Sequence, residues 1–369
     1  MRLMISGGGT GGHIYPALAL IKRLQERHLL DEVMYVGTEK GLEARIVRQA
    51  GIPFETVDVQ GFRRKLTFDN FKTITKFQKS IKRARQLIKD FQPDVVVGTG
   101  GYVCAPVVYA ASRLNIPTLI HEQNSVAGLS NKFLAHYVDR IAYVFPEVAH
   151  QFTEKKKLVQ TGNPRAQEVS TLKPQGMLAD LGLRVDLPTL LIVGGSRGAA
   201  PLNKAMIAAI PEFSEKSYQI LFITGRALYD QVKDNVGPLT EKSNIKIVPY
   251  LDNLSQLLPE ISVLCGRSGA TTLAEVTALG IPSILVPSPY VTHDHQNKNA
   301  DYLVSNYAAI LLPEVELNGR SLVAAADHIL LDSDVWQQMH QAALKLATPD
   351  ASDQLIKVLE ALIYEHRQA

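Results

Sequence analysis

Short apolar runs alternate with longer segments of helical periodicity along the whole chain. The runs are apolar at every position, which is typical of strands covered on both faces in parallel α/β sheets. A helical segment between consecutive strands is the crossover connection that parallel pairing requires. The predicted strands are Leu3–Ser6, Val33–Val36, Val95–Gly98, Thr118–Ile120, Arg140–Tyr143, Leu190–Val193, Gln219–Ile223, Ile245–Val248, Val263–Cys265 and Ser283–Val286.

The two halves of the chain repeat one local pattern. The stretches "LMISGGGTGGHIYPALA" (3–19) and "LLIVGGSRGAAPLNKAM" (190–206) both read as a strand, a glycine-rich loop and a helix with an early proline. This predicts an α/β protein of two doubly wound, Rossmann-like domains whose ligand-binding edges face each other across a cleft. The predicted domains are residues 1–162 plus 350–369, where a final amphipathic helix folds back, and residues 163–349.

The composition supports two ordinary globular domains. The chain has 369 residues, of which 46% are hydrophobic and 20% charged, and this length favours two domains. The two cysteines, Cys104 and Cys265, lie outside any C-x-x-C pattern, which predicts reduced thiols in a cytosolic protein. We expect no signal peptide and no transmembrane helix, because no apolar run approaches the roughly 18 residues that a span needs.

Basic residues concentrate in one segment. Residues 61–91 hold ten Lys and Arg against two Asp, although the whole chain has a net charge of only +3. One interpretation is a core-packed helix with a solvated basic face. Nucleic acid is not expected as a partner, since no recognised binding motif accompanies the charge. Because aromatic residues are interleaved with the cations, we predict that residues 61–91 contact an anionic membrane surface.

The first glycine loop matches the dinucleotide fingerprint G-x-G-x-x-G at residues 7–12. The fingerprint also needs an acid at the end of the second strand, but Glu39 falls late, in a loop. Three interpretations remain: a dinucleotide loop, a tight turn without a ligand, and a loop whose N–H groups bind an anion or a sugar. The third is favoured, and His13 directly follows the loop.

Two further polar segments follow predicted strands in the first half. "GTGGYVCAP" (98–106) is a second glycine turn, and "HEQNS" (121–125) places several polar side chains after a buried strand. Asn124 or Ser125 could simply cap a helix. Because parallel strands end at one edge of a sheet, however, these segments and the first loop are expected to form a site.

The second half offers two loops suited to a diphosphate. "GGSRGA" (194–199) and "RSGATTLAEV" (267–276) each open a helix, whose N–H groups can bind phosphate. Glu275 follows one turn into the second helix, where a carboxylate can accept hydrogen bonds from ribose hydroxyls or simply be solvated.

The remaining polar motif, "PSPYVTHDHQNKNA" (287–300), contains an H-x-H pattern that is weak as a metal site. The amides of Gln296 and Asn299 better suit sugar hydroxyls. "DSD" (332–334) is predicted to cap a helix rather than to bind a metal.

Seven motifs occur in one order over nearly the whole chain: "GGTGGHIYPALA", "GTGGY", "HEQN", "GNP", "GGSRGA", "RSGATTLAE" and "HQNKNA". Together they resemble the MurG family of bacterial glycosyltransferases. The resemblance implies a GT-B fold and inverting transfer of GlcNAc from UDP-GlcNAc to the MurNAc 4-hydroxyl of undecaprenyl-diphosphate-MurNAc-pentapeptide (lipid I). It also implies no metal, no cofactor, peripheral attachment to the cytoplasmic face of the cell membrane, and contacts with cell-wall synthesis proteins.

The same resemblance implies the site residues. Donor contacts are expected at Thr10, Gly11, Gly12, Asn124, Arg165, Ser196, Leu251, Ala270, Thr271, Thr272, Glu275, Gln296 and Asn299. Acceptor contacts are expected at Gly9, Gly100, Gly101, Tyr102 and His121. Two positions depart from the family pattern. Members of the family commonly have the sequence G-N-P-V-R, whereas Arg165 here directly follows Pro164. Arg197 stands where the family often has glutamine.

The reaction needs a base for the acceptor hydroxyl. A histidine can accept a proton near neutral pH, so His13 is the first candidate, and Glu122 is the alternative if the site excludes water. Two other functions stay open: another GT-B enzyme, such as a glycolipid synthase or a UDP-sugar 2-epimerase, and a nucleotide-sugar or anion-binding module that needs no base.

Overall fold

The computed structural model describes residues 1–61, 68–195, 197–236 and 244–368, together with every side chain in them except those at 68–72 and 74. It divides the chain into two compact units, Met1–Glu168 with Asp350–Ala369, and Val169–Pro349. The predicted boundary lies after residue 162, whereas helix α6 (Pro164–Ser170) spans the point where the first unit ends. The expected phosphate contact Ser196 and the basic side chains of Arg63, Arg64, Lys65 and Lys72 lie outside the described residues.

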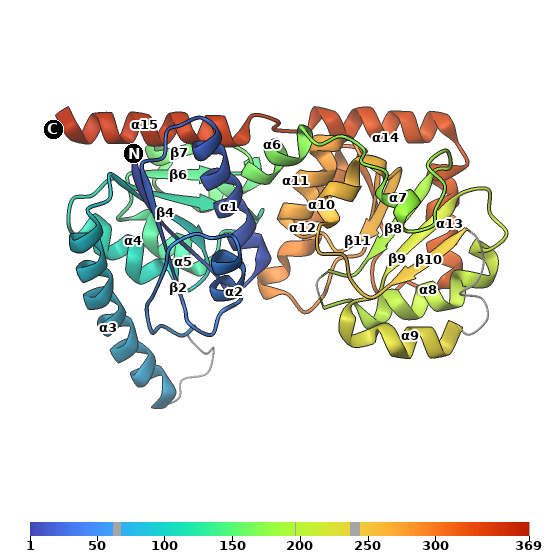
Figure 1. Ribbon diagram of the computed structural model, residues 1–369, viewed down its shortest axis with the longest axis horizontal. Helices are drawn as coiled ribbons and strands as arrows, with labels where there is room; N and C mark the ends of the chain where they lie inside the picture. The colour runs from blue at the N-terminus through green and yellow to red at the C-terminus, as the bar shows by residue number, and fades with distance from the viewer. Residues whose placement is uncertain (62–67, 196, 237–243, 369) are drawn as a thin grey trace. The chain divides into compact units, whose positions relative to one another are not determined.

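The first unit is a seven-stranded parallel sheet with the strand order β3-β2-β1-β4-β5-β6-β7 (Figure 1). Its strands are β1 (Arg2–Gly7), β2 (Glu32–Gly37), β3 (Phe54–Thr56), β4 (Val95–Gly100), β5 (Thr118–Glu122), β6 (Arg140–Tyr143) and β7 (Leu158–Gln160). Its helices are α1 (Gly11–Glu26), α2 (Leu42–Gln49), α3 (Phe68–Phe91), α4 (Cys104–Ser112), α5 (Leu129–Ala135) and α15 (Ala351–Gln368), with 3-10 turns at Pro146–Gln151 and Lys155–Lys157.

Helices cover both faces of this sheet, as the fully apolar strands predict. Alternate residues of a strand point to opposite faces, so Leu3 and Ile5 of β1 pack with α1 and α15. Met4 of the same strand packs instead with α3, α4 and α5. Each face therefore has its own core, and the sheet is buried between them.

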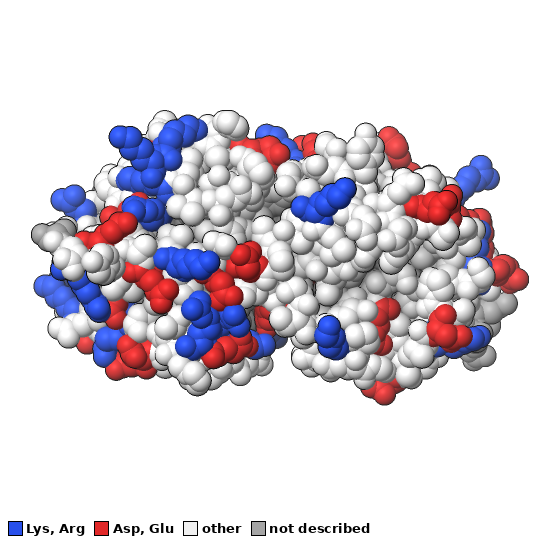
Figure 2. Space-filling model, turned by 90° about the horizontal axis from the view of Figure 1, so that it is seen from above, with Lys and Arg blue, Asp and Glu red and all other residues white. Residues whose placement is uncertain are grey.

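The C-terminal helix α15 belongs to the first unit. Its buried Leu355 and Leu359 lie in the core with α1, and Asp353 accepts hydrogen bonds from Arg23 at 2.9 and 2.7 Å. The Arg23 guanidinium is the main reason that the pKa of Asp353 falls to about 2. Figure 2 shows that acidic and basic side chains both occur on the visible surface of each unit.

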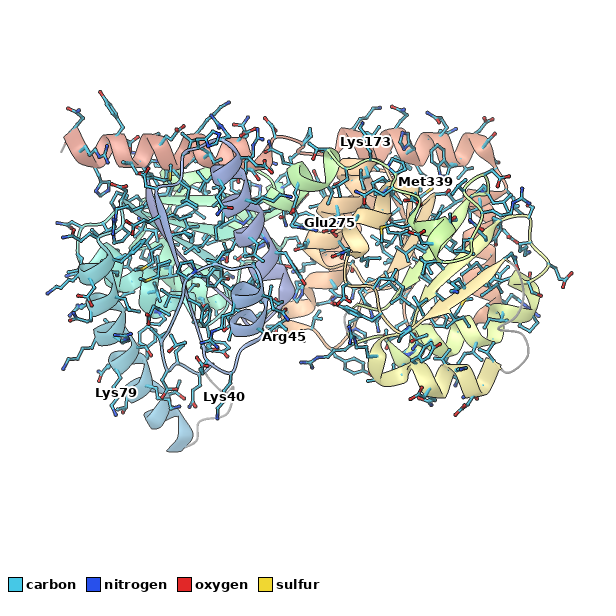
Figure 3. The ribbon with its side chains drawn as sticks, in the orientation of Figure 1. Lys40, Arg45, Lys79, Lys173, Glu275 and Met339 are labelled. Atoms are coloured by element: carbon cyan, nitrogen blue, oxygen red, sulfur yellow. The ribbon has the colours of Figure 1, made fainter. Side chains whose placement is uncertain are left out.

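The basic segment forms much of helix α3, and its C-terminal half is packed against the sheet. Leu87, Ile88 and Phe91 are buried in the core, as the interpretation of a core-packed basic helix predicts. Lys79, which is labelled in Figure 3, is exposed on this helix, and so is Lys82. Ile88 and Phe91 are therefore not available for insertion into a membrane interface.

The second unit is a six-stranded parallel sheet with the order β10-β9-β8-β11-β12-β13. Its strands are β8 (Thr189–Val193), β9 (Gln219–Ile223), β10 (Ile245–Val248), β11 (Val263–Gly266), β12 (Ser283–Leu285) and β13 (Ala309–Leu311). Its helices are α7 (Met177–Asp180), α8 (Ala200–Phe213), α9 (Tyr229–Val236), α10 (Leu254–Leu257), α11 (Ala270–Leu279), α12 (His295–Ser305), α13 (Gly319–Leu330) and α14 (Ser333–Lys345), with 3-10 turns at Arg226–Leu228, Leu258–Glu260 and Thr292–Asp294.

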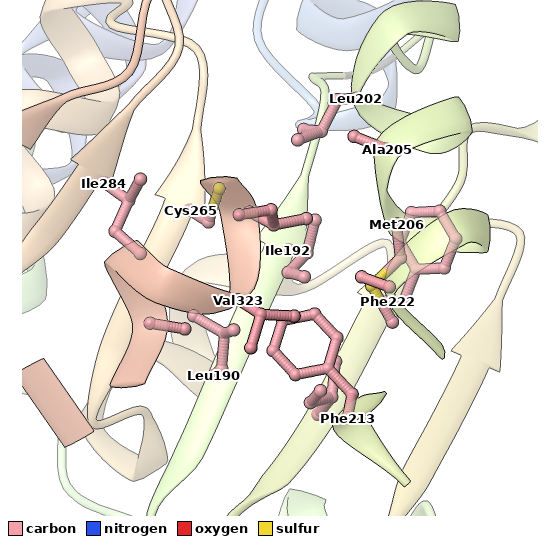
Figure 4. Packing of buried hydrophobic residues seen from close by; sticks show 14 of the residues in the cluster. Leu190, Ile192, Leu202, Ala205, Met206, Phe213, Phe222, Cys265, Ile284 and Val323 are labelled. Atoms are coloured by element: carbon pink, nitrogen blue, oxygen red, sulfur yellow. The ribbon is translucent and has the colours of Figure 1, made fainter. Parts of the chain in front are cut away.

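One face of the second sheet packs against α8 and α13. Leu190 and Ile192 point to the same side of β8 and meet Met206 and Phe213 of α8 and Val323 of α13 (Figure 4). All five side chains are at most 2% exposed. Truncating a large side chain at such a position, as in Phe213→Ala, costs about 3–5 kcal/mol of stability.

Every predicted strand is present. Three short edge or near-edge strands, β3, β7 and β13, were not among the predictions, and each has only three residues. The predicted helix cap at "DSD" is confirmed, since Asp332 accepts hydrogen bonds from the N–H groups of Asp334 and Val335. No helix in the described part of the chain is long and apolar enough to cross a membrane.

Both cysteines are free thiols, as predicted, and both are buried. Burial raises the pKa of the Cys104 and Cys265 thiols to about 12. Both side chains therefore act as small apolar groups in the two cores.

Candidate active site

The loop after β1 lies at the carboxyl edge of the first sheet. The chain leaves β1 toward β2 on one side, whereas β4 pairs with the other side of β1 and leads on to β5. The crevice between β1 and β4 is therefore the topological switch point, where doubly wound sheets bind ligands. Helix α1 begins at Gly11, with Thr10 as its extended N-cap residue.

His13 is half-buried in the first turn of α1, and its imidazole is held in one orientation. Nδ1 lies 2.8 Å from the carbonyl oxygen of Gly8. Since a carbonyl oxygen can only accept, Nδ1 carries the hydrogen in the neutral ring and Nε2 carries the lone pair. The Thr99 hydroxyl fixes the main chain of the same residue by donating to the His13 carbonyl oxygen at 2.7 Å. The imidazole is therefore preorganised to accept a proton at Nε2.

The glycine turn after β4 makes room for this arrangement. Gly100 and Gly101 have φ values of +110° and +81°, which glycine adopts at little cost. A Cβ on Gly100 would lie 2.7 Å from Cδ2 of His13, and one on Gly101 would lie 2.4 Å from the Gly8 carbonyl oxygen. The two glycines expected to contact the acceptor thus also leave the space that the His13 ring and its Gly8 partner occupy. Tyr102, which follows them, is 39% exposed.

The carboxylate of Glu122, the alternative base, is hydrogen-bonded to the turn that follows β5. Strand β5 continues two residues past its predicted end, so Glu122 is part of a buried strand and only 2% exposed. Its carboxylate accepts hydrogen bonds from Asn124 N at 3.1 Å, Gly128 N at 2.9 Å and Asn131 Nδ2 at 2.8 Å. This geometry favours a structural role, in which Glu122 shapes the turn that carries Asn124, over the role of base.

His121 is also buried, and both of its ring nitrogens are engaged. Nε2 lies 2.9 Å from the Gly162 carbonyl oxygen, and Nδ1 lies 2.9 Å from Nε2 of Gln123. Burial lowers the pKa of His121 to about 4, although the hydrogen bond to Gly162 opposes this shift. A neutral ring with Nε2–H satisfies both contacts. His121 therefore does not present a ring nitrogen to an acceptor, contrary to the expectation from the motif.

A buried carboxylate that the sequence analysis did not single out lies beside the first loop. Glu43 in the first turn of α2 is 1% exposed, and its Oε2 accepts a hydrogen bond from Gly9 N at 3.1 Å. The N–H of Gly9, expected to serve the acceptor, is thus already engaged. One sequence signal was available: Glu43 lies four residues before Val47, on the apolar face of its helix.

The second unit repeats the switch point between β8 and β11. Gly195 and Gly198 have φ values of +91° and +75°, and the Gly198 N–H donates to the Gly195 carbonyl oxygen at 2.9 Å. Arg197 is exposed. Asn203 in the first turn of α8 is buried and donates to the Thr224 carbonyl oxygen at 2.9 Å. These contacts fix the described part of the loop at the N-terminus of α8.

The turn after β11 leads directly into α11, and Gly269 is the N-cap residue of that helix. A Cβ on Gly269 would meet nothing within 4 Å. The hydroxyl oxygen of Thr271 is buried and has no hydrogen-bond partner within the described residues. Ala270 and Thr272 flank it, and Glu275 lies in the next turn of α11 (Figure 3).

Helix α12 fastens this turn. Asn299 is buried and donates to the Ser268 carbonyl oxygen at 3.1 Å, and the Ser268 hydroxyl donates to the Gln296 carbonyl oxygen at 2.7 Å. The side-chain oxygen of Gln296 accepts from Ser288 N at 2.8 Å. Of the two side-chain amides expected at the sugar, that of Asn299 holds the turn before α11, whereas that of Gln296 contacts Ser288 in the segment after β12.

Two more expected donor contacts lie elsewhere. Leu251 follows Tyr250, whose ring lies 4.6 Å from the Arg226 guanidinium. Arg165 belongs to the first unit, where it forms an ion pair with Glu168 and is 12% exposed. Because its charge is already paired, the geometry does not favour Arg165 as a phosphate ligand.

The described residues contain no group of three His, Cys, Asp or Glu side chains that could hold a metal ion. In the H-x-H segment, His293 and Asp294 have left-handed φ values of +55° and +53°, and Nδ1 of His295 lies 2.8 Å from the Thr292 carbonyl oxygen. These residues form a turn that leads into α12.

The chain matches known families along most of its length. Residues 3–143 match the glycosyltransferase family 28 N-terminal domain, and residues 189–355 match the family 28 C-terminal domain. The UDP-N-acetylglucosamine–N-acetylmuramyl-(pentapeptide) pyrophosphoryl-undecaprenol N-acetylglucosamine transferase of Latilactobacillus sakei subsp. sakei is 54% identical over 364 residues, covering 98% of this chain and 100% of that protein.

Solved structures give the same family and fold. MurG of Acinetobacter baumannii is 29% identical, with a TM-score of 0.77 over 98% of this chain and 99% of that one. A putative UDP-N-acetylglucosamine 2-epimerase from Listeria monocytogenes is 14% identical, with a TM-score of 0.71 over 99% and 97% of the two chains, and shares the fold alone. Two parallel α/β units on this plan form the GT-B fold, and the chain belongs to glycosyltransferase family 28 and, within it, to the MurG family.

Proposed function

We propose that this protein transfers GlcNAc from UDP-GlcNAc to the MurNAc 4-hydroxyl of lipid I, giving lipid II and UDP. Membership of the MurG family supports the substrates. The observation that carries the chemistry is the orientation of His13, whose Nδ1–H is held by the Gly8 carbonyl oxygen so that Nε2 has the lone pair. A binding module would have no need of such a base.

In the proposed reaction, Nε2 of His13 takes the proton of the acceptor hydroxyl as its oxygen attacks the anomeric carbon. The bond from that carbon to the diphosphate oxygen breaks, and its electron pair leaves with UDP. Attack from the face opposite to UDP inverts the anomeric centre and forms the β(1→4) bond. Removal of the proton and alignment of the two reactants are the contributions of the first unit.

The second unit is proposed to hold the donor. Backbone N–H groups at the N-termini of α8 and α11 can stabilise the departing diphosphate. The buried Thr271 hydroxyl is a further donor for a phosphate oxygen. Glu275, one turn further along α11, is placed to accept from ribose hydroxyls, and backbone near Leu251 would meet the uracil. This assignment relies on N–H and O–H groups rather than on a metal ion.

Membrane attachment is proposed through the exposed basic face of α3. Lys79, Lys82, Arg85 and Lys89 are exposed on this helix, while Lys76 and Arg83 form ion pairs with Asp58 and Glu55. Because its apolar face is packed into the core, the described part of α3 supports electrostatic attraction to anionic lipids. This would hold the protein at the cytoplasmic face of the cell membrane.

The proposed function is tested by UDP release with UDP-GlcNAc and a short-chain lipid I, with the lipid product identified by mass spectrometry. We expect UDP and GlcNAc-extended lipid in equal amounts, with or without EDTA. Release of UDP with formation of the 2-epimer would instead identify an epimerase. Binding of UDP without any glycosylated lipid would identify a binding module.

A further inference from the structure

The carboxylate of Glu43 is buried at the base of the first glycine loop. Its Oε1 accepts two hydrogen bonds from Thr38, at 3.0 Å from N and 2.6 Å from Oγ1. Its Oε2 accepts from Gly9 N at 3.1 Å. Burying an ionised carboxylate is costly unless donors surround it, and here three donors from two segments do so.

The Glu43 side chain occupies the space that a Cβ atom would need at three glycines. A Cβ on Gly8 would lie 2.5 Å from Cδ of Glu43, and a Cβ on Gly41 would lie 2.1 Å from Oε1. A Cβ on Gly37 would lie 2.7 Å from Cγ. These glycines come from the loop after β1, the end of β2 and the N-cap of α2. Three segments are thus shaped around the carboxylate.

A single peptide group joins Glu43 to His13. The N–H of Gly9, which donates to Glu43, and the C=O of Gly8, which accepts from Nδ1 of His13, belong to the same peptide bond. The carboxylate and the imidazole therefore bind opposite sides of one planar amide. A negative charge at the N–H polarises the amide and strengthens the hydrogen bond at its oxygen.

We propose that Glu43 is a positioning residue for His13, acting through the Gly8–Gly9 peptide. It fixes the Nδ1–H form of the neutral ring and stabilises the imidazolium that forms when Nε2 takes the acceptor proton. The proton from the hydroxyl ends on Nε2, the Nδ1 hydrogen stays in place, and Glu43 remains ionised throughout. A carboxylate that orients an active-site histidine is a common arrangement, and here a peptide group lies between the two. This role rests on the proposed function.

The sharpest variant is Glu43→Gln. The two hydrogen bonds from Thr38 keep an oxygen on their side, so the new NH₂ group faces the N–H of Gly9 and two donors meet. The peptide must shift, and His13 loses its fixed acceptor. We expect kcat for lipid II formation to fall by about 10- to 100-fold. KM for UDP-GlcNAc should stay within about twofold of the wild-type value, a change of only ~0.4 kcal/mol in free energy.

A second readout does not depend on activity. In ¹³C- and ¹⁵N-labelled wild-type protein, the ring shifts of His13, assigned by comparison with His13→Ala, should report the Nδ1–H form. In Glu43→Gln they should report a mixture of both neutral forms. A merely structural loss of stability would leave the shifts of the folded population unchanged, so the spectrum separates the two roles.

Two controls match this variant. Glu39→Gln changes an exposed carboxylate that pairs with Arg48 and should leave kcat and the ring shifts unchanged. Thr38→Val removes one hydrogen bond to Glu43 but keeps the contact with Gly9, so it should lower the melting temperature and leave the His13 form intact. If Glu43→Gln does not fold, the ring shifts of His13 can still be measured in Thr38→Val.

Wild-type kcat together with wild-type ring shifts in Glu43→Gln would overturn the inference. So would a wild-type spectrum showing His13 with its hydrogen on Nε2. If the wild type makes no lipid II at all, the proposed function fails, and the ring shifts still decide whether Glu43 positions His13.

Discussion

The two glycine loops of this protein have similar sequences and different surroundings. Each follows the first strand of a doubly wound sheet and leads into a helix. In the first unit the protein itself fills the space: Gly8 is crowded by Glu43, and Gly101 is crowded by the Gly8 carbonyl oxygen. In the second loop a Cβ on Gly195 would meet nothing within 4 Å, whereas Gly194 and Gly198 are crowded by main-chain atoms of Ala199 and Thr224 and not by a carboxylate.

This difference indicates a division of labour. A loop whose N–H is already bound to an internal carboxylate is unsuited to a diphosphate at that point, because two anions would compete for one donor. Backbone N–H groups at a helix N-terminus are suited to it. We therefore propose that the first loop serves the base and the second the charged donor.

The largest effect should come from removing the base. His13→Ala is expected to lower kcat for GlcNAc transfer by about 10³-fold, within the 10²–10⁴ typical of general-base catalysis, while the Kd for UDP-GlcNAc changes little. Single-turnover kinetics and calorimetric titration measure the two quantities. His328→Ala, which removes an exposed histidine of α13, is the control. A large loss of UDP-GlcNAc affinity in His13→Ala would erase the distinction between the loops.

Acid should weaken the first unit. The pKa of His121 is about 4 in the folded protein against an ordinary 6.5, so the unfolded chain binds a proton that the folded unit does not. Stability is therefore complete above pH 6.5 and falls by up to about 3 kcal/mol as the pH drops to 4. Asp353, with a pKa lowered to about 2, loses its contribution only at lower pH.

Chemical denaturation of the wild type and of His121→Gln across this range measures that loss. In the variant, the free energy of unfolding should depend less steeply on pH, although its value at neutral pH will be lower than in the wild type. Equal slopes in wild type and variant would show that His121 is not the group responsible.

A pair of glycine substitutions compares the crowding directly. Gly101→Ala and Gly195→Ala both place alanine at a positive φ, +81° and +91°, which costs about 1–2 kcal/mol in each. Only at Gly101 does the methyl group also meet a backbone oxygen, at 2.4 Å. We expect Gly101→Ala to be less stable than Gly195→Ala by about 2 kcal/mol, measured by urea denaturation. Equal losses of stability in the two variants would mean that the Gly8 carbonyl oxygen moves away from the new methyl group at little cost.

Changes on the donor side should affect binding rather than chemistry. Glu275→Gln weakens charge-assisted hydrogen bonds to the ribose, each worth about 1.5–3 kcal/mol and in part kept by the amide, so the Kd for UDP should rise by about tenfold. The variant should discriminate less against 2′-deoxyuridine diphosphate than the wild type does. Glu212→Gln, on α8 of the same unit, is the control. An unchanged Kd in Glu275→Gln would remove the carboxylate from the nucleotide site.

The smallest effect concerns the membrane. Reversing Lys79 and Lys82 should weaken binding to vesicles containing phosphatidylglycerol by about fivefold per charge, from ~1 kcal/mol each. The matched control reverses Lys233 and Lys357, which are exposed on α9 and α15. If both double variants bind vesicles equally well, the attraction is not specific to α3.

Much of the fold was predictable because it depends on local pattern. Fully apolar strands such as Leu190–Val193 and glycine loops at fixed places in the repeat specify two doubly wound sheets. The strand β7, "LVQ", could not be predicted, since three residues without alternation carry no periodic signal. The end of β5 was also misplaced, because His121 and Glu122 read as polar loop residues although partners far along the chain bury them.

The candidate site was only partly predictable for the same reason. Sequence position indicated His13, but the state of its ring depends on a carbonyl that becomes its partner only when the loop folds. Glu43 escaped notice since its role depends on contacts with Thr38 and Gly9, which belong to other segments. Spacing shows which residues share an edge of a sheet, whereas hydrogen-bond partners decide which of them stay open to a ligand.

The division of labour between the loops is tested most directly by NMR titration of the ¹⁵N-labelled full-length protein with UDP. We predict that the amide signals of Gly195, Gly198 and Gly269 shift with the bound fraction, while those of Gly8 and Gly9 keep their positions. A shift of the Gly9 amide as large as that of Gly269 would contradict the account, because it would place the diphosphate on the N–H that Glu43 occupies.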